Sequence, residues 1–151
     1  MEPLLVVDQL CKRFPVRKGF FGREVGQVHA VEDVSFQLDA GRSLGLVGES
    51  GCGKTTTGRC LLRLIEPTSG SVRFHGTELL DLPPAALRRQ RRHLQMIFQD
   101  PYGSLNARMT VGEMLAEPMR VHGLIEPDAI EDRVVELLHR AGDLFGAASL
   151  L

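Results

Sequence analysis

Short apolar segments separated by turn-forming residues run through much of the chain, and this pattern predicts strands. The segment VEDVSFQL at 31–38 places apolar side chains at alternate positions and therefore predicts a half-buried strand. Continuous apolar runs at 4–7, 43–47 and 94–98 predict three further strands, and the latter two are expected to be buried. The basic segment 14–27 contains three glycines that break any period, so it is predicted to be a protruding loop.

Longer segments with apolar side chains three or four positions apart predict helices in the rest of the chain. Helices are expected over 53–66, 83–92, 111–121 and 128–140, with a small β-hairpin over 71–80. Pro67 ends the first helix, because the residue before a proline resists helical geometry. Thr110, with Glu113 three residues later, predicts a capping box at the start of the third helix. Ile130, Val134 and two leucines share one face of the last helix, which predicts that this face packs inward.

The composition is ordinary for a soluble globular chain, with 43% hydrophobic and 25% charged residues. A length of 151 residues fits one domain with a real core. The formal net charge of -1 gives no overall field that would attract nucleic acid or an anionic membrane. The N-terminus lacks the basic residues of a secretory leader, and no apolar run approaches the ~20 residues of a spanning helix. Any membrane role is therefore expected to be peripheral.

Cysteines, histidines and one basic run predict no separate site. Cys11, Cys52 and Cys60 are odd in number and scattered, which predicts reduced thiols in a cytoplasmic setting. The histidines show no shared metal spacing, so no zinc site is expected. The run RRQRRH at 88–93 is either a nucleic-acid patch or a solvated helix face. No aromatic residues interleave with its arginines, so the helix face is favoured and no nucleic-acid partner is expected.

The segment LVGESGCGKTTTGRC at 46–60 has the spacing of a phosphate-binding loop. Its glycines let the backbone wrap tightly, so that N–H groups converge on an anion at the N-terminus of the following helix. Lys54 can reach the β- and γ-phosphates of a nucleotide, and the Thr55 hydroxyl can ligate Mg²⁺. The residues expected to bind nucleotide here are Gly48, Glu49, Ser50, Gly51, Cys52, Gly53, Lys54, Thr55 and Thr56. The alternative is an ordinary glycine-rich turn between a strand and a helix that binds nothing.

Two stretches together, GESGCGKTT and MIFQDPYGSLNARMTVGEMLAEP, resemble the ATP-binding subunits of ABC transporters. Within them, the chain looks most like the peptide importer group (dipeptide, oligopeptide and nickel uptake), from about Leu4 to Arg140. The resemblance implies an α/β fold, a P-loop NTPase core of the ABC ATPase type with an N-terminal antiparallel β subdomain and the start of a helical subdomain. Residues 1–151 would form part of one such domain. The β subdomain and P-loop core would span about 1–100, and the Q-loop and first helices about 101–151.

The resemblance also implies roles for two residues outside the loop. Gln99 occupies the Q-loop position, where the family's glutamine contacts Mg²⁺ and the attacking water and senses the transmembrane partner. Lys54 and Gln99 are therefore the expected catalytic residues, and Thr55 and Gln99 the expected metal contacts. Phe14 stands where the family places an aromatic ring that stacks on adenine, a contact worth about 1–3 kcal/mol. The alternatives are a polar strand-end residue for Gln99 and simple packing for Phe14.

The function implied by the resemblance is that of an ATP-binding subunit of an ABC importer, which couples ATP binding and hydrolysis to uptake of peptides or similar solutes. ATP and Mg²⁺ would be the cofactors. Transmembrane permease subunits and a second ATP-binding subunit would be the partners, at the cytoplasmic side of the cell membrane. One alternative is a truncated P-loop module that binds nucleotide without turnover. Another is a P-loop enzyme of a different class, such as a kinase, which the QDPYGSLNARMTV stretch disfavours.

The sequence also departs from the family's pattern. Ala107 stands where importers of this group usually have proline, and Thr55 where serine is more common. An LSGGQ-like signature, a Walker B strand and a switch histidine do not occur in these 151 residues, so turnover by the isolated chain is not expected. The segment LLVVD at 4–8 looks like a Walker B strand, but it precedes the P-loop and matches the family's opening β strand. The strands at 43–47 and 94–98 are expected to lack neighbours, which would expose their edges.

Overall fold

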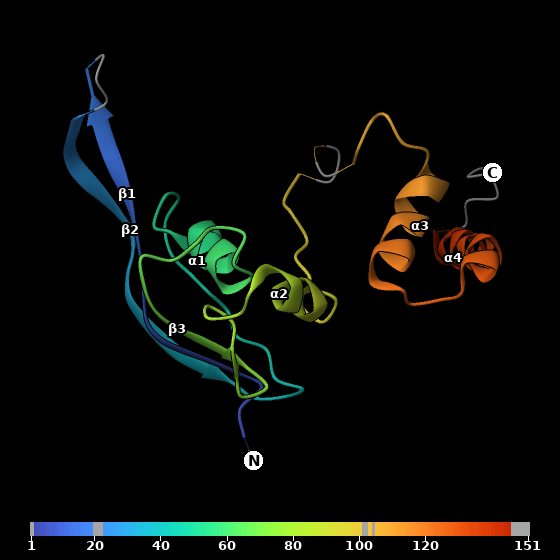
Figure 1. Cartoon of the computed structure of the whole chain (residues 1–151), viewed down its shortest axis with the longest axis horizontal. Helices are drawn as coiled ribbons and strands as arrows, with labels where there is room; N and C mark the ends of the chain where they lie inside the picture. Colours follow the sequence, from blue (N-terminus) through green and yellow to red (C-terminus); the bar gives the residue numbers. More distant parts are fainter. Residues whose placement is uncertain (1, 20–22, 101–102, 104, 146–151) are drawn as a thin grey trace. The chain divides into compact units, whose positions relative to one another are not determined.

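The computed structural model describes residues 2–19, 23–100, 103 and 105–145. The chain divides into two compact units, and the boundary lies between Gln95 and Met96. In the described part of the chain, the first unit contains a sheet and two short helices, and the second contains two longer helices (Figure 1). Part of the QDPYGSLNARMTV stretch, at positions 101, 102 and 104, lies outside the described residues. The expectation of one partial domain that divides near residue 100 stays a prediction.

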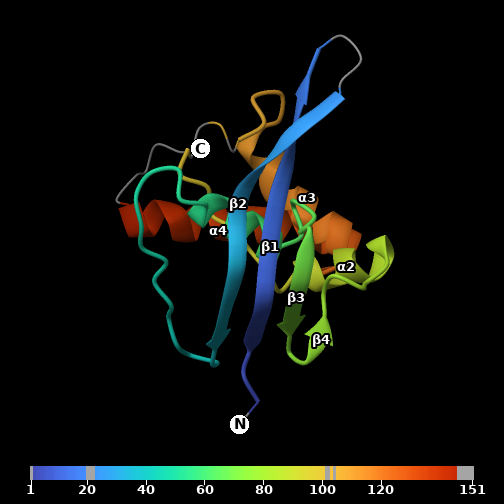
Figure 2. The same ribbon diagram turned by 90° about the vertical axis from the view of Figure 1, so that its left-hand side faces the viewer.

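The first unit is built on an antiparallel sheet with the strand order β2-β1-β3-β4 (Figure 2). Its strands are β1 (Leu5–Lys18), β2 (Arg23–Leu38), β3 (Ser69–Phe74) and β4 (Thr77–Glu78). The strands predicted at 4–7 and 31–38 and the hairpin predicted over 71–80 are confirmed. The Walker B-like segment 4–8 accordingly lies in β1, between two antiparallel neighbours.

The predicted loop over 14–27 is wrong, because its described residues continue both strands into a long two-stranded ribbon. Phe14 lies opposite Val28 and Val16 opposite Gly26, so cross-strand pairs hold the ribbon together. A glycine weakens a strand but does not prevent one where a partner strand is present. The register shifts at four places along the whole β1–β2 pair, and such bulges bend a strand pair, as the curvature of β1 and β2 in Figure 1 shows. Residues 20–22 lie outside the described residues.

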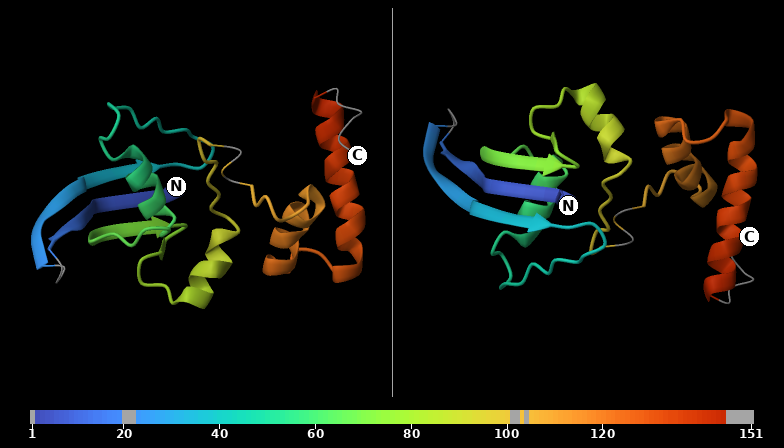
Figure 3. Two further views of the ribbon diagram at one scale, coloured as in Figure 1. Left: turned by 90° about the horizontal axis from the view of Figure 1, so that it is seen from above. Right: turned by 90° about the horizontal axis from the view of Figure 1, so that it is seen from below.

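A hydrophobic core lies between this sheet and helix α1 (Lys54–Leu61), which crosses one face of the sheet (Figure 3). Leu10 and Leu79 are fully buried in it, and burial of one such side chain contributes about 1.5–3 kcal/mol. The other buried members of this core are Val7, Cys60, Val72 and Phe74. Packing against the sheet therefore fixes the helix that follows the glycine-rich loop.

Helix α1 is shorter than predicted and ends at Leu61. Arg63, just beyond the helix, has a left-handed backbone with a φ of 50°, which a right-handed helix cannot continue. Its guanidinium donates to two carbonyl oxygens before the second helix, at 3.2 and 2.6 Å, and so holds the chain in this conformation. Helix α2 (Pro84–Arg91) confirms the helix predicted over 83–92. Arg91 donates to the carbonyl oxygen of Arg63 at 2.8 Å, so one arginine of the basic run has a structural contact.

The buried strands predicted at 43–47 and 94–98 are not present. Neither segment forms a strand among the described residues. Val47 is 96% exposed and Ile97 is 98% exposed. An apolar run becomes a buried strand only where neighbouring strands satisfy its backbone N–H and C=O groups. Because neither segment forms a strand among the described residues, the exposed strand edges expected at 43–47 and 94–98 are not formed there either.

The second unit is formed by a pair of packed helices. These are α3 (Val111–His122) and α4 (Ile130–Phe145), joined through the short helix η1 (Pro127–Ala129). The capping box is confirmed, because the Thr110 hydroxyl accepts from the N–H of Glu113 at 3.2 Å. The Glu113 carboxylate in turn accepts from the N–H of Thr110 at 2.7 Å. The helices pack through Ala116, Met119, Ile130 and Val134, so the inward face predicted for the last helix is confirmed.

Candidate nucleotide-binding site

The loop over 48–56 curls tightly before and into the first turn of α1. Gly51 and Gly53 have φ values of 84° and 97°, which residues with a Cβ rarely adopt. A Cβ on Gly48 would lie 2.6 Å from the Cys52 sulfur, so the loop is also closed at its start. Such a backbone can turn several N–H groups toward one side, where they form a cradle for an anion. The backbone geometry therefore explains why glycine stands at each of these three positions.

Gly53 also fixes the loop to the sheet. A Cβ at this position would lie 2.0 Å from the carbonyl oxygen of Ala30 and 3.8 Å from Cγ2 of Val31. Ala30 is the extra residue at a bulge in β2, since the pairing with β1 skips from Val31 to His29. A bulge re-aims the backbone locally, and here it brings a carbonyl against the N-cap of α1. The N-terminus of the helix therefore has a set position on β2.

Charged side chains flank this bulge at the surface. Arg13 donates to the Glu32 carboxylate at 2.5 and 3.2 Å, and His29 Nδ1 lies 2.8 Å from the same carboxylate. The hydrogen bond from Arg13 holds the pKa of Glu32 below its usual value. His29 and Glu32 are exposed and Arg13 is partly exposed, and contacts of this kind contribute little to stability. These contacts join β1 to β2, whereas the close packing at Gly53 joins the loop to the sheet.

Lys54 supplies the positive charge of the loop. Its ammonium donates to the carbonyl oxygens of Gly48 and Glu49, both at 2.7 Å, and lies 3.4 Å from the Cys52 sulfur. These contacts hold the ammonium against the loop backbone. The first N–H groups of a helix have no intrahelical acceptor, and the helix dipole adds partial positive charge at the same end. An anion at this helix terminus would meet the ammonium and these N–H groups together, which suits a phosphate.

The other loop residues differ in how exposed they are. Thr55 is exposed in the first turn of α1, and Thr56 beside it is partly buried. Ser50 and Cys52 are exposed, and the Cys52 thiol is free. Among the described residues, no three His, Cys, Asp or Glu side chains gather as a metal-binding group. A Mg²⁺ ion needs no such group here, since it commonly keeps several waters and binds phosphate oxygens with few protein ligands. The exposed hydroxyl of Thr55 fits that role.

Phe14 and Gln99, the predicted site residues outside the loop, lie in different units. Phe14 is on β1, in the same unit as the loop, and is 37% exposed, so packing leaves part of its ring open. Gln99 is exposed in an irregular segment of the second unit, and its place beside the loop stays a prediction. The sequence reasoning missed Lys12, whose ammonium lies 4.8 Å from the centre of the Phe14 ring. Residues two positions apart on a strand share a face, so the spacing of Lys12 and Phe14 could have indicated this contact. The prediction of a loop over 14–27 hid that signal.

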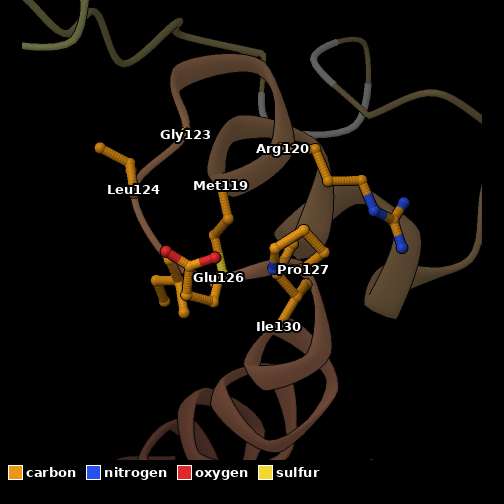
Figure 4. Close-up of a pocket in the computed structure, with 8 residues that line it drawn as sticks. Met119, Arg120, Gly123, Leu124, Glu126, Pro127 and Ile130 are labelled. Atoms are coloured by element: carbon orange, nitrogen blue, oxygen red, sulfur yellow. The ribbon is translucent and has the colours of Figure 1, made fainter.

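A cavity of about 560 Å³ lies in the second unit, between the end of α3 and the start of α4 (Figure 4). Its lining residues are Met119, Arg120, Gly123, Leu124, Ile125, Glu126, Pro127 and Ile130. In Figure 4 the Arg120 guanidinium points away from the other labelled side chains, whereas the Glu126 carboxylate lies among them. A mostly apolar lining with an inward carboxylate disfavours an anion. The lining of this cavity therefore does not suit a phosphate.

Solved structures of ATP-binding cassettes share this fold. A dimeric post-hydrolysis state of the ATP-binding cassette MJ0796, bound to ADP and Pi, matches with a TM-score of 0.71 at 21% identity and covers 89% of this chain and 56% of that chain. The ATP-binding subunit of an ABC transporter matches with a TM-score of 0.56 at 28% identity, over 82% of this chain and 44% of that chain. The predicted fold class, an ABC-type P-loop ATPase fold with an antiparallel β subdomain, is therefore confirmed.

The sequence comparisons extend this from fold to family. A model of the ABC transporter family matches residues 31–149, and the chain belongs to this family. The glutathione import ATP-binding protein GsiA of Pectobacterium atrosepticum is 52% identical over 141 residues, and GsiA of Escherichia coli strain K12 is 51% identical over 141 residues. Both alignments cover 93% of this chain but 23% of the relative, so the chain spans about a quarter of the length of these relatives. The predicted resemblance to importer ATP-binding subunits is confirmed.

Proposed function

We propose that the chain is part of the ATP-binding subunit of an ABC importer and that the loop over 48–56 holds the phosphates of ATP. The observation that carries this proposal is the Lys54 ammonium, bound to two loop carbonyl oxygens at 2.7 Å beside the N-terminus of α1. A full positive charge, a helix terminus equivalent to about half a charge, and a glycine-wrapped backbone then act on the same anion.

Each predicted site residue has a place in this proposal. Lys54 contacts the β- and γ-phosphates, and the backbone of the loop surrounds them. Thr55 and Gln99 would hold Mg²⁺, which neutralises charge on the phosphate oxygens when it is bound. Phe14 would stack on adenine, and Gln99 would also contact the attacking water. The loop members of the site are Gly48, Glu49, Ser50, Gly51, Cys52, Gly53, Lys54, Thr55 and Thr56.

The relatives support a proposal for the solute and the partners. Because GsiA is named for glutathione import, we propose glutathione or a similar small peptide as the solute. Transmembrane permease subunits would be partners at the cytoplasmic side of the membrane. A second ATP-binding subunit would be another, which the dimeric form of the ATP-binding cassette MJ0796 supports. No helix in the described part of the chain is long and apolar enough to cross a membrane.

Calorimetric titration with MgATP tests the phosphate contact. Lys54→Ala should raise Kd about 10- to 150-fold, because a hydrogen bond to a charged group is worth about 1.5–3 kcal/mol. Lys18→Ala is the matched control, since it removes the same charge from the ribbon and should leave Kd within about twofold. Equal affinity of the Lys54→Ala and Lys18→Ala variants for MgATP would refute the proposed role of the loop.

Uptake of labelled glutathione by cells tests the proposed solute. Cells whose whole transporter carries Lys54→Ala in this subunit should take up glutathione no faster than cells that lack the subunit. Cells with Lys18→Ala should transport normally. If the unmodified transporter supports ATP-dependent uptake of another solute and no uptake of glutathione, the proposed solute is wrong while the phosphate site stands.

A further inference from the structure

Lys12 and Phe14 lie on the face of the sheet that the phosphate loop meets at β2. Lys12 pairs directly with Val31, so both side chains point to the same face of the sheet. Cγ2 of Val31 lies 3.8 Å from the position of a Cβ on Gly53, which shows that this face meets the loop. Phe14 follows Lys12 by two residues on a strand and therefore shares its face.

The ammonium of Lys12 is held from two sides. It donates to the carbonyl oxygen of Glu66 at 2.7 Å, beyond the end of α1. It also lies 4.8 Å from the centre of the Phe14 ring, within the range of a cation–π contact. Lys12 thus ties the ring to the segment that follows the helix. Because the ring is 37% exposed, part of its surface stays open beside this contact.

The distance from Phe14 to the loop suits the two ends of one nucleotide. Phe14 pairs with Val28, and Val28 is two residues from Ala30, whose carbonyl oxygen meets Gly53. Two residues along a strand span about 7 Å, and the step between paired strands adds about 5 Å. A base on the Phe14 ring and phosphates in the loop would be separated by a span of this order, which a ribose and the α-phosphate can bridge.

We propose that Lys12 is a positioning residue for the base of the nucleotide: it covers one face of the Phe14 ring and holds the ring so that the other face stacks on adenine. The proposal rests on the nucleotide site proposed above. Lys12 acts here through the ring and makes no contact with the phosphates. Removing its charge should therefore weaken the binding of ligands that carry a base and spare ligands that carry only phosphates.

The test compares MgATP with magnesium tripolyphosphate, which offers phosphates without a base, in titrations of the full chain. Lys12→Met keeps the aliphatic stem and removes the ammonium, and it should raise Kd for ATP about two- to fivefold, the size of an exposed cation–π contact. Its Kd for tripolyphosphate should stay unchanged. Lys12→Arg keeps a cation over the ring and should bind ATP as the parent does. Lys18→Met is the matched control on the same strand.

A double-mutant cycle separates positioning from simple loss of charge. Phe14→Ala should raise Kd for ATP about 5- to 150-fold, the size of a lost base stack, and Lys12→Met added to it should have no further effect. The proposal is wrong if Lys12→Met weakens the binding of ATP and of tripolyphosphate equally. It is also wrong if Lys12→Met weakens ATP binding as much in the Phe14→Ala variant as in the parent. Circular dichroism spectra that match the parent confirm that each variant is folded. If the parent binds neither ligand, the nucleotide site itself fails, which is a different result.

Discussion

Replacing Gly53 by alanine should destabilise the first unit more than the same replacement at a glycine with similar backbone geometry. Gly53 has a φ of 97°, and a left-handed backbone costs an alanine about 1–2 kcal/mol. The new Cβ would also lie 2.0 Å from the carbonyl oxygen of Ala30, far inside ordinary contact. That oxygen belongs to a paired strand and cannot swing aside as a flexible side chain would. Overpacking of this kind costs about 1–3 kcal/mol more.

Gly41→Ala is the control, because it shares the backbone cost without the clash. Gly41 has a φ of 73°, and a Cβ there would have no atom within 4 Å. Gly53→Ala should therefore cost about 2–5 kcal/mol and Gly41→Ala about 1–2 kcal/mol of the free energy of unfolding. Urea unfolding followed by circular dichroism measures both variants under the same conditions. Equal free energies of unfolding for the two variants would show that the contact between the loop and the bulge does not hold the loop in place.

Three further predictions concern the helix cap, the pH dependence of its carboxylate and the cysteines. Thr110→Ala should cost about 0.5–2 kcal/mol in urea unfolding, whereas Thr110→Ser, which keeps the hydroxyl, should cost little; equal losses would contradict the capping role. The hydrogen bond from the N–H of Thr110 lowers the pKa of Glu113. The stability that this carboxylate contributes is therefore present above its unfolded-state pKa and is lost as the pH falls through its folded pKa. Glu113→Gln should remove that part of the acid dependence of the free energy of unfolding. Iodoacetamide should label Cys52 before Cys60, because Cys52 is exposed whereas burial raises the pKa of the Cys60 thiol, and equal labelling rates by mass spectrometry in the folded chain would contradict this.

Features that depend on neighbours in sequence were predicted well. The capping box of Thr110 and Glu113 is formed within four residues, so its pattern is sufficient to locate the start of α3. The glycine spacing of the loop over 48–56 likewise reflects local backbone geometry, which the positive φ values at Gly51 and Gly53 now explain. Local sequence therefore located these elements and the candidate phosphate loop.

Features that depend on distant partners were predicted poorly. The segments 43–47 and 94–98 have the composition of buried strands, but a strand forms only where another strand pairs with it. The glycines of the segment 14–27 predict a loop, whereas pairs such as Phe14 with Val28 make its described residues a ribbon. The contact between Lys12 and Phe14 followed from that ribbon and could not be predicted without it. Long-range pairing, rather than local propensity, decided each case.

The central claim is that the loop over 48–56 holds the phosphates of ATP, and amide chemical shifts of the isotope-labelled chain test it most directly. Titration with MgATP should shift the amide signals of the loop and of the first turn of α1 strongly, because their N–H groups would donate to phosphate oxygens. Signals of α4 in the second unit should stay in place. Saturating MgATP that leaves the loop signals unchanged, or that shifts chiefly the signals around the cavity near Gly123, would contradict the account.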